Sequence, residues 1–358
     1  MSEEVLQEGD VIVRAHGSLR RLTLNRPKAL NAITLDMVAT MTARLRAWAD
    51  DPGVGTVLID GAGERAFCAG GDIRALYDAA KSGDALSADS LPARFWADEY
   101  RLDVLIARYP KPVIAVMDGL VMGGGVGLSA HATYRIVTER SAIAMPEVGI
   151  GYFPDVGVSF VLARAPWQLG TYVALTGSRI NAQDALFCGL GNCTLPASRL
   201  NEIPAVLADC RTGKEVWTAF HTLQVSPQPG KLLKARDWIE RCFGRETVEN
   251  IVEALSACEE DGAAEALDAL RNASPTSLKI TLRNVREARA FARVEESFQQ
   301  DYRMSLACIA DHDFVEGIRA AIVDKDRKPA WRPGTLAEVT PDIVERHFKP
   351  LGALELKF

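Results

Sequence analysis

Three consecutive glycines, Gly123-Gly124-Gly125, follow the apolar run Pro112–Met117, which has the character of a buried strand, and precede a short predicted helix. Glycine is about 1 kcal/mol less favourable than alanine inside a helix, so helix propensity does not explain this run. A turn at which backbone amides approach a ligand, with the positive end of a helix behind them, explains it better. The sequence therefore favours a fold with a ligand site at a strand-to-helix turn.

A second turn of the same kind, Ala69-Gly70-Gly71-Asp72, precedes a helix predicted over Ile73–Ala80. If the two turns converge, one amide from each can bind the same oxygen, and such a pair stabilises an oxyanion by on the order of several kcal/mol. Either cluster alone is weak evidence, because many such turns are only tight connections. Both together, with the carboxylate of Glu147 further along the chain, favour acyl chemistry.

The order of the predicted elements indicates an α/β core. We expect a hairpin from Val11–Ala15 and Arg20–Leu24, and a helix that starts near Thr34 and runs to about Trp48. A small, polar stretch over Lys81–Leu91 predicts a loop, and a helix is predicted over Ala93–Tyr109. Such alternation of strands and helices is typical of a sheet with ligand groups at its strand-to-helix turns.

The pattern changes after about Asn201, where strands become scarce. Long amphipathic helices are predicted beyond this point, at Ile251–Leu270, Leu278–Ala292 and Glu295–Ala310. A chain of 358 residues is long enough for two packing units. We therefore predict a catalytic core over residues 1–205 and a helical C-terminal region over residues 206–358 that packs on the core.

Composition excludes several classes of partner. The hydrophobic content of 48% and the charged content of 25% match an ordinary soluble globular protein. The formal net charge of -6 argues against nucleic acid as the main partner, because such binding needs a basic face. No segment approaches the roughly 18 uninterrupted apolar residues of a membrane span, so no membrane partner is expected.

The seven cysteines contain no CxxC pair and no metal-like Cys/His cluster, so we expect reduced packing residues and no metal site. The acidic N-terminus, MSEEVLQEGD, lacks the positive region and apolar run of a secretory signal. These two features together predict a cytoplasmic location.

At its motifs the sequence resembles the crotonase, or enoyl-CoA hydratase/isomerase, superfamily, and within it the 3-hydroxyisobutyryl-CoA hydrolases. The resemblance covers nearly the whole chain. The matching segments are Leu24–Pro27 with Ala29–Ala32, Ala66–Arg74, Met122–Gly127, Met145–Glu147, Phe153–Gly157, Ser274–Lys279, His312–Ala320, Asp324–Asp326 and Leu356–Phe358. The resemblance implies an α/β fold built as a crotonase-like spiral of ββα units, with a helical C-terminal region.

The resemblance also implies roles for individual residues. The amides of Gly71 and Gly124 would form the oxyanion hole for the thioester carbonyl, and Glu147 would be the main catalytic carboxylate. Asp155 would hold the polar end of the acyl group or help to position water. Glu99 falls where the hydrolases have a glutamate near the acyl group.

The implied partner is an acyl-CoA, and CoA would be part of the substrate, so no separate cofactor is expected. Lys28-Ala29-Leu30 resembles the segment that lies against the CoA moiety, and Ala69, beside the first glycine pair, is also expected at the substrate. Members of the superfamily often form trimers. A homo-oligomer (trimer or hexamer) and a monomer both stay open here.

One departure from the hydratase pattern separates the two activities. Hydratases that add water across a double bond use two glutamates, and the first of these corresponds to Gly127 in this chain. Glu147 without this second carboxylate suits thioester hydrolysis, either as general base on water or as a nucleophile through an anhydride. We therefore expect hydrolysis of 3-hydroxyisobutyryl-CoA, or of a close short 3-hydroxyacyl-CoA, in valine breakdown. The alternatives are an enoyl-CoA hydratase or isomerase, and a non-catalytic acyl-CoA-binding subunit.

Each candidate acid also has a purely structural interpretation. Glu147 can be a satisfied buried cap, and Asp155 can cap a helix that begins at Val158. Glu99 can be an exposed acid on a helix. Cys68, beside the first glycine turn, is expected to pack rather than react, because no histidine lies in a recognisable partner motif.

Overall fold

The computed structural model describes residues 3–82 and 90–358, which fall into two compact units. Unit 1 is made of Met1–Gly71, Arg101–Ile143 and Ile180–Gly230, and unit 2 of Asp72–Tyr100, Ala144–Arg179 and Lys231–Phe358. The chain thus passes between the units several times. The predicted division at residue 205 follows sequence order instead and stays a prediction. Residues 83–89 of the loop predicted over Lys81–Leu91 lie outside the described residues.

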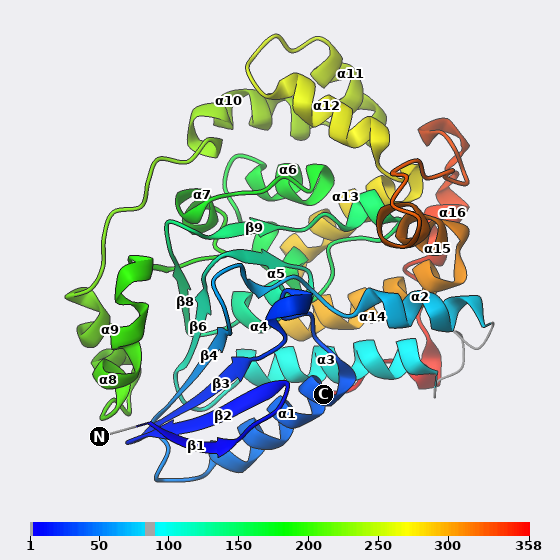
Figure 1. Cartoon of the computed structure of the whole chain (residues 1–358). Helices are drawn as coiled ribbons and strands as arrows, with labels where there is room; N and C mark the ends of the chain where they lie inside the picture. Colours follow the sequence, from blue (N-terminus) through cyan, green and yellow to red (C-terminus); the bar gives the residue numbers. More distant parts are fainter. Residues whose placement is uncertain (1–2, 83–89) are drawn as a thin grey trace. The chain divides into compact units, whose positions relative to one another are not determined.

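Seven of the described strands form one mixed sheet in unit 1, in the order β1-β2-β3-β4-β6-β8-β10 (Figure 1). β1, β2 and β3 pair antiparallel, and the other neighbours pair parallel. The strands are β1 (Glu4–Gln7), β2 (Val11–His16), β3 (Leu19–Leu24), β4 (Thr56–Gly61), β6 (Val113–Met117), β8 (Tyr134–Val137) and β10 (Cys193–Thr194). The predicted hairpin is confirmed, because β2 pairs with β3.

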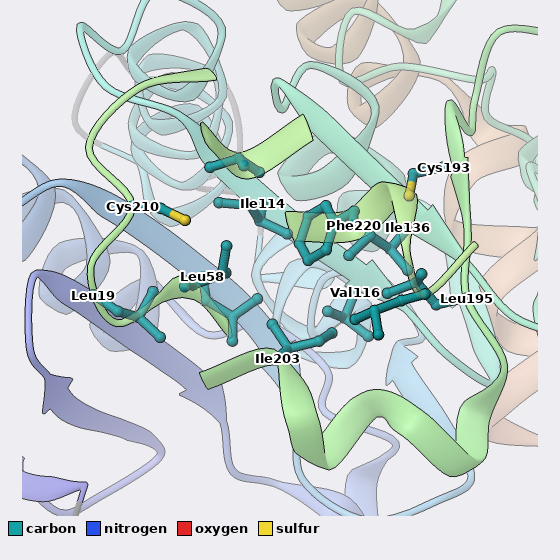
Figure 2. Packing of buried hydrophobic residues seen from close by; sticks show 13 residues of the cluster. Leu19, Leu58, Ile114, Val116, Ile136, Cys193, Leu195, Ile203, Cys210 and Phe220 are labelled. Carbon is teal, nitrogen blue, oxygen red and sulfur yellow. The ribbon is translucent and has the colours of Figure 1, made fainter. Parts of the chain in front are cut away.

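A hydrophobic cluster covers one face of this sheet. The central parallel strands are almost continuously apolar, since every residue of β6 is buried, as expected for strands covered on both faces. On the side shown in Figure 2, Leu58 and Ile114 from the strands meet Ile203 of α8 (Ile203–Leu207) and Phe220 of α9 (Gly213–His221). These two helices therefore hold their place by burying apolar side chains against the sheet.

A second sheet contains three short strands in the order β5-β7-β9. The strands are β5 (Ala66–Cys68), β7 (Leu120–Met122) and β9 (Ala142–Ala144), and α4 (Gly124–Ala130) follows β7. The predicted helix near Thr34 is confirmed as α1 (Leu35–Ala49), and the Thr34 hydroxyl caps it by accepting from the Met37 amide at 3.3 Å. Another helix of unit 1 is α7 (Ala182–Phe187).

Unit 2 is mainly helical. Its helices are α2 (Ile73–Lys81), α5 (Val158–Leu162), α6 (Leu169–Thr176), α10 (Leu232–Phe243), α11 (Val248–Ser256), α12 (Ala263–Asn272), α13 (Pro275–Glu287), α14 (Val294–Ala310), α15 (His312–Ile318) and α16 (Pro341–Arg346). α3 (Leu91–Ala107) starts in unit 2 and ends in unit 1. None of the described helices has the length and apolar character needed to cross a membrane. No strand follows Thr194 among the described residues, in agreement with the expected change of pattern.

One of the three long C-terminal helices was predicted wrongly. Ile251–Leu270 is not one helix, because α11 ends at Ser256 and α12 begins at Ala263. The break includes Gly262, the N-cap of α12, whose φ of 89° lies in the left-handed region that a continuous helix excludes. The helix predicted over Glu295–Ala310 is confirmed by α14.

The cluster on the sheet gives a stability prediction. Phe220 is completely buried, whereas Trp217 on the same helix is 49% exposed. We expect Phe220→Ala to lower the free energy of unfolding by about 3–5 kcal/mol, because it removes a full aromatic side chain from packed surroundings. Trp217→Ala is the matched control and should cost about 1 kcal/mol at most. Urea titration followed by fluorescence measures both, and equal losses would contradict this description of the core.

Candidate active site

The two glycine turns lie against each other within unit 1. Gly70 has a φ of 108°, and a Cβ atom built on it would lie 3.8 Å from the amide nitrogen of Gly124. A Cβ atom on Gly125 would lie 2.4 Å from the carbonyl oxygen of Cys68, which no side chain can tolerate. The turns therefore converge, and glycine is required where their backbones meet. The oxyanion role of Gly71 and Gly124 stays a prediction.

The amide of Gly124 stands at the start of α4. Gly123 precedes it as the cap residue with a φ of 48°, and every residue of α4 is buried. Amides in the first turn of a helix have no acceptor inside the helix, so they need a partner from elsewhere. A carbonyl oxygen of a substrate could supply this partner.

The residues predicted to contact CoA lie beside the first glycine turn, also in unit 1. Lys28 and Ala29 are exposed on the short 3-10 helix Pro27–Ala29, and Leu30 follows with a left-handed φ of 52°. The amide of Ala69 donates to the carbonyl oxygen of Leu30 at 3.0 Å. The structure thus brings the predicted substrate-binding residues of both segments together.

Asn31 fixes this loop, a role that the sequence did not reveal. It is buried with a left-handed φ of 57°. Its side-chain amide donates to the carbonyl oxygens of Ala62 (3.0 Å) and Ala66 (2.9 Å), and its side-chain oxygen accepts from the Arg26 amide (2.9 Å). A small side chain that tolerates the left-handed region and hydrogen-bonds backbone suits this position.

The three predicted carboxylates all belong to unit 2, and all are buried. Glu99 on α3 is 3% exposed, Glu147 at the start of the 3-10 helix Glu147–Ile150 is 7% exposed, and Asp155 is 5% exposed. Burial, and then the charge of Asp155, raise the pKa values of Glu99 and Glu147 well above the ordinary range. Burial raises the pKa of Asp155 to about 6. The three side chains therefore form one electrostatic cluster.

The structural interpretations of these acids do not hold. Glu99 is not an exposed helical acid. Gly157 caps α5, and Asp155 contributes only its backbone carbonyl, which accepts from the Val158 amide at 3.0 Å. Glu147 is not a satisfied cap, because its Oε2 has no hydrogen-bond partner in the described part of the chain. The same is true of Oε1 of Glu99.

Such unpartnered atoms are costly. A buried polar atom without a hydrogen bond destabilises a fold by about 1–3 kcal/mol, so its presence calls for an explanation. Carboxyl groups with perturbed pKa values and unused hydrogen-bonding capacity are typical of ligand sites. Glu99 and Glu147 each have one oxygen that could meet water or substrate.

Sequence reasoning missed the groups that hold Asp155. The hydroxyl of Tyr100 donates to its Oδ2 at 2.6 Å, and the hydroxyl of Tyr152 lies 3.2 Å from the same oxygen. Ser305 on α14 contacts both tyrosine hydroxyls. A signal for Ser305 existed in the sequence, because Ser297, Asp301 and Ser305 repeat at helical spacing and would form a polar stripe on one helix face.

The turn that follows Asp155 is strained. Val156 has a φ of 53°, although its branched side chain disfavours the left-handed region, at a cost of about 1–3 kcal/mol. The Val156 side chain is buried, and the Gly157 amide donates to Oδ2 of Asp301 on α14 at 2.8 Å. Packing and this hydrogen bond therefore hold the backbone in a conformation that it would otherwise leave.

The comparisons with known proteins agree on one family. The profile described as "Enoyl-CoA hydratase/isomerase" matches residues 19–348. A relative from Gallus gallus named "3-hydroxyisobutyryl-CoA hydrolase, mitochondrial" is 39% identical, over 97% of this chain and 91% of its own. A relative of the same name from Xenopus laevis is 40% identical, over 100% of this chain and 93% of its own.

Two solved structures are similar over almost the whole chain. A structure described as a carnitinyl-CoA dehydratase from Mycobacterium thermoresistibile has a TM-score of 0.91 and 44% identity, covering 98% of this chain and 99% of its own. A structure described as an enoyl-CoA hydratase from Rhodobacter sphaeroides 2.4.1 has a TM-score of 0.91 and 41% identity, covering 98% and 100%. These two structures are described as a dehydratase and a hydratase, whereas the two relatives are named as hydrolases.

The predicted cytoplasmic location is wrong, because the relatives from Gallus gallus and Xenopus laevis are named as mitochondrial proteins. Cysteine content could not have revealed this. Unpaired thiols indicate a reducing setting, and a reducing setting does not identify one compartment.

The buried glutamate leads to a prediction about pH and stability. Below the ordinary pKa of about 4.5, Glu147 is protonated in both the folded and the unfolded chain, and its raised pKa has no effect on stability. As the pH rises above this value, the unfolded chain loses the proton first, so folding becomes less favourable until the folded-state pKa is passed. Glu147→Gln removes this titration.

We therefore expect the melting temperature of Glu147→Gln, relative to the unmodified protein, to increase by about 2–4 °C between pH 5 and pH 8, measured without substrate. Taking the difference between two pH values cancels any constant effect of the new amide. Glu253→Gln, at an exposed glutamate on α11, is the control and should show no such trend. A flat difference for Glu147→Gln would mean that Glu147 is not held in its protonated form.

Proposed function

The chain belongs to the enoyl-CoA hydratase/isomerase family, and we propose that it hydrolyses the thioester of 3-hydroxyisobutyryl-CoA or of a close short 3-hydroxyacyl-CoA. The products are the free hydroxy acid and CoA. The predicted α/β crotonase-like fold is confirmed by the family match and by the two similar solved structures. The relatives of about 40% identity, which are named as hydrolases, support the choice of reaction.

The observation that carries the proposal is the absence of a side chain at position 127. Gly127 lies within α4, after Gly124, and is buried. Hydratases of the family have the first of two catalytic glutamates at the corresponding position. The α4 backbone here presents no carboxylate to the thioester, so Glu147 would act without that partner.

The chemistry assigns a task to each group. The amides of Gly71 and Gly124 would bind the thioester oxygen and stabilise the negative charge that develops on it. Glu147 would take a proton from water as the water oxygen bonds to the carbonyl carbon. The C–S bond then breaks, and the CoA thiolate takes up a proton. In the other route the Glu147 carboxylate itself attacks the carbonyl carbon and displaces the CoA thiolate, which takes up a proton, and water then cleaves the resulting anhydride to the free acid and Glu147.

The electrostatic state of Glu147 suits either route. Burial raises its pKa well above the ordinary value, so the carboxyl group binds a proton more firmly than an exposed glutamate does. A carboxylate with a raised pKa is a stronger base, and such a base takes a proton from water more readily.

Asp155 would hold the 3-hydroxyl of the acyl group. Its Oδ2 accepts from the Tyr100 hydroxyl and lies 3.2 Å from the Tyr152 hydroxyl, and neither tyrosine contact involves its Oδ1. An acyl hydroxyl that donates to Oδ1 would add a hydrogen bond from the substrate to this carboxylate. This arrangement supports a substrate with a hydroxyl near the thioester. Participation in valine breakdown and the binding of CoA only as part of the substrate belong to the same proposal.

An enoyl-CoA hydratase is the main alternative, and the descriptions of the two solved structures favour it. Gly127 argues against it. A non-catalytic acyl-CoA-binding subunit is the second alternative. The presence of both Glu147 and Asp155 argues against that role, because binding alone does not need buried carboxyl groups with raised pKa values.

Release of free CoA from 3-hydroxyisobutyryl-CoA, followed with a thiol reagent, tests the proposal. We expect steady thiol release and little hydration of crotonyl-CoA, because the second glutamate is missing. Rapid hydration of crotonyl-CoA without thiol release would assign the protein to the hydratases. Calorimetric binding of the ester without any turnover would support the binding subunit.

Glu147→Gln tests the role of the carboxylate. We expect a loss of kcat of about 10²–10⁴-fold, because an amide cannot act as base or nucleophile. Binding of the CoA ester should remain, and Glu253→Gln should keep full activity. A Glu147→Gln variant that hydrolyses the substrate at the normal rate would remove Glu147 from the mechanism.

A further inference from the structure

Two buried tyrosine hydroxyls contact one oxygen of Asp155, and one buried serine hydroxyl contacts both tyrosines, all within unit 2. Tyr100 comes from α3, Ser305 comes from α14, and Tyr152 precedes Asp155 in the same loop. The oxygen of Tyr100 lies 2.6 Å from Oδ2 of Asp155 and 2.9 Å from Oγ of Ser305. The oxygen of Tyr152 lies 3.2 Å and 2.5 Å from the same two atoms.

The positions of the protons follow from the partners. Oγ of Ser305 lies 2.7 Å from the carbonyl oxygen of Asp301, and this carbonyl can only accept, so the Ser305 proton points to it. Ser305 must then accept the proton of Tyr152 across the 2.5 Å contact. The proton of Tyr100 goes to Asp155. Each of the three hydroxyl protons thus lies in one of the three shortest contacts. Tyr152 therefore does not donate a proton to Asp155.

We propose that Ser305 is a positioning residue for the reaction, because it accepts the Tyr152 proton and so leaves Tyr100 as the single hydroxyl donor to Asp155. The tyrosine hydroxyls then contact the carboxylate only at Oδ2, and Oδ1 faces no hydroxyl of this network, so it could accept from the substrate hydroxyl. This inference rests on the proposed hydrolase function for its catalytic meaning. The arrangement of protons is independent of that function.

The frame around Ser305 keeps its direction fixed. Asp301, one helical turn earlier on α14, accepts from the Gly157 amide at 2.8 Å and from the Asn284 side chain on α13 at 3.1 Å. Asn284 accepts in turn from Gln300 at 3.0 Å. Ser305 therefore stands on a helix that is tied both to the Asp155 loop and to its neighbour α13.

Other titratable groups also act on Asp155 or respond to it. Glu99 on α3, Glu147 on its 3-10 helix, and Asp301 and Cys308 on α14 all have pKa values raised in part by the charge of Asp155. Substitution of a hydroxyl group leaves these charges in place. A change in the titration of Asp155 after such a substitution would therefore report on the donors.

Removal of the two hydroxyls should have opposite effects. Tyr100→Phe takes away the direct donor, so the carboxylate loses stabilisation and the pKa of Asp155 should rise. Ser305→Ala takes away the acceptor of Tyr152, whose proton can then turn to Oδ2 as a second donor. The pKa of Asp155 should therefore fall. Simple loosening of the packing would move both variants in the same direction.

The experiment follows the carboxyl carbon of Asp155 by NMR in protein labelled with ¹³C-aspartate, with the signal assigned from Asp155→Asn. From a value of about 6, we expect Tyr100→Phe to move the midpoint up by about 1 pH unit. Ser305→Ala should move it down by about half a unit. The double variant should lie below Tyr100→Phe alone. The acid limb of kcat/KM for 3-hydroxyisobutyryl-CoA should shift in the same directions.

Ser297→Ala is the matched control. Ser297 is an equally buried serine on α14, and its hydroxyl contacts Ser159 at 2.6 Å. It should leave the Asp155 midpoint unchanged. If Ser305→Ala does not fold, Ser305→Cys gives the same expected direction, because sulfur is a weak acceptor.

A midpoint that rises in Ser305→Ala, or does not move in either single variant, would overturn the proposal. Opposite shifts in a protein that releases no thiol from any acyl-CoA would support the proton arrangement and refute the hydrolase function. The two ideas therefore fail separately.

Discussion

Burial of carboxyl groups without cationic partners is the constraint on which unit 2 depends. Glu99, Glu147, Asp155 and Asp301 are almost fully removed from water, and no ion pair among the described residues involves any of them. Burial is the largest cause of the raised pKa of each. An unpaired carboxylate loses several kcal/mol on leaving water, so such groups must be neutral or must gather hydrogen-bond donors.

The four acids meet this constraint in two ways. Asp155 accepts from the Tyr100 hydroxyl, and Asp301 accepts from a backbone amide and an asparagine side chain. Glu99 and Glu147 each retain a buried oxygen without a partner among the described residues. The donors therefore define a rigid part of the cluster, which also holds the strained Val156 in place. The two glutamates form the part of the cluster whose buried oxygens could gain hydrogen-bond partners from a bound substrate.

Local features of the fold could be predicted from the sequence, and distant contacts could not. The glycine turns were recognisable because the φ of 108° at Gly70 and the close backbone approach at Gly125 both favour a residue without a side chain. β5 and β7 escaped notice because three residues are too few for a periodic pattern. Ser305 escaped because its partner Tyr100 is 205 residues away in the chain. The position of a serine on a helix does not predict which distant residues its hydroxyl contacts in the folded chain.

The type of reaction depends on fewer residues than the fold does. The fold of this chain matches that of a structure described as an enoyl-CoA hydratase with a TM-score of 0.91. Its sequence is about 40% identical to those of relatives named as hydrolases. Proteins named for different reactions thus resemble this chain closely, so the fold alone does not identify the reaction. The position of Gly127 on α4 is buried and close in sequence to Gly124, whose amide we propose for the oxyanion hole. In the hydratases a glutamate at this position acts with a second glutamate to add water to the double bond of an enoyl-CoA. Without it, the proposed reaction has one glutamate, which directs water to the carbonyl carbon of the thioester.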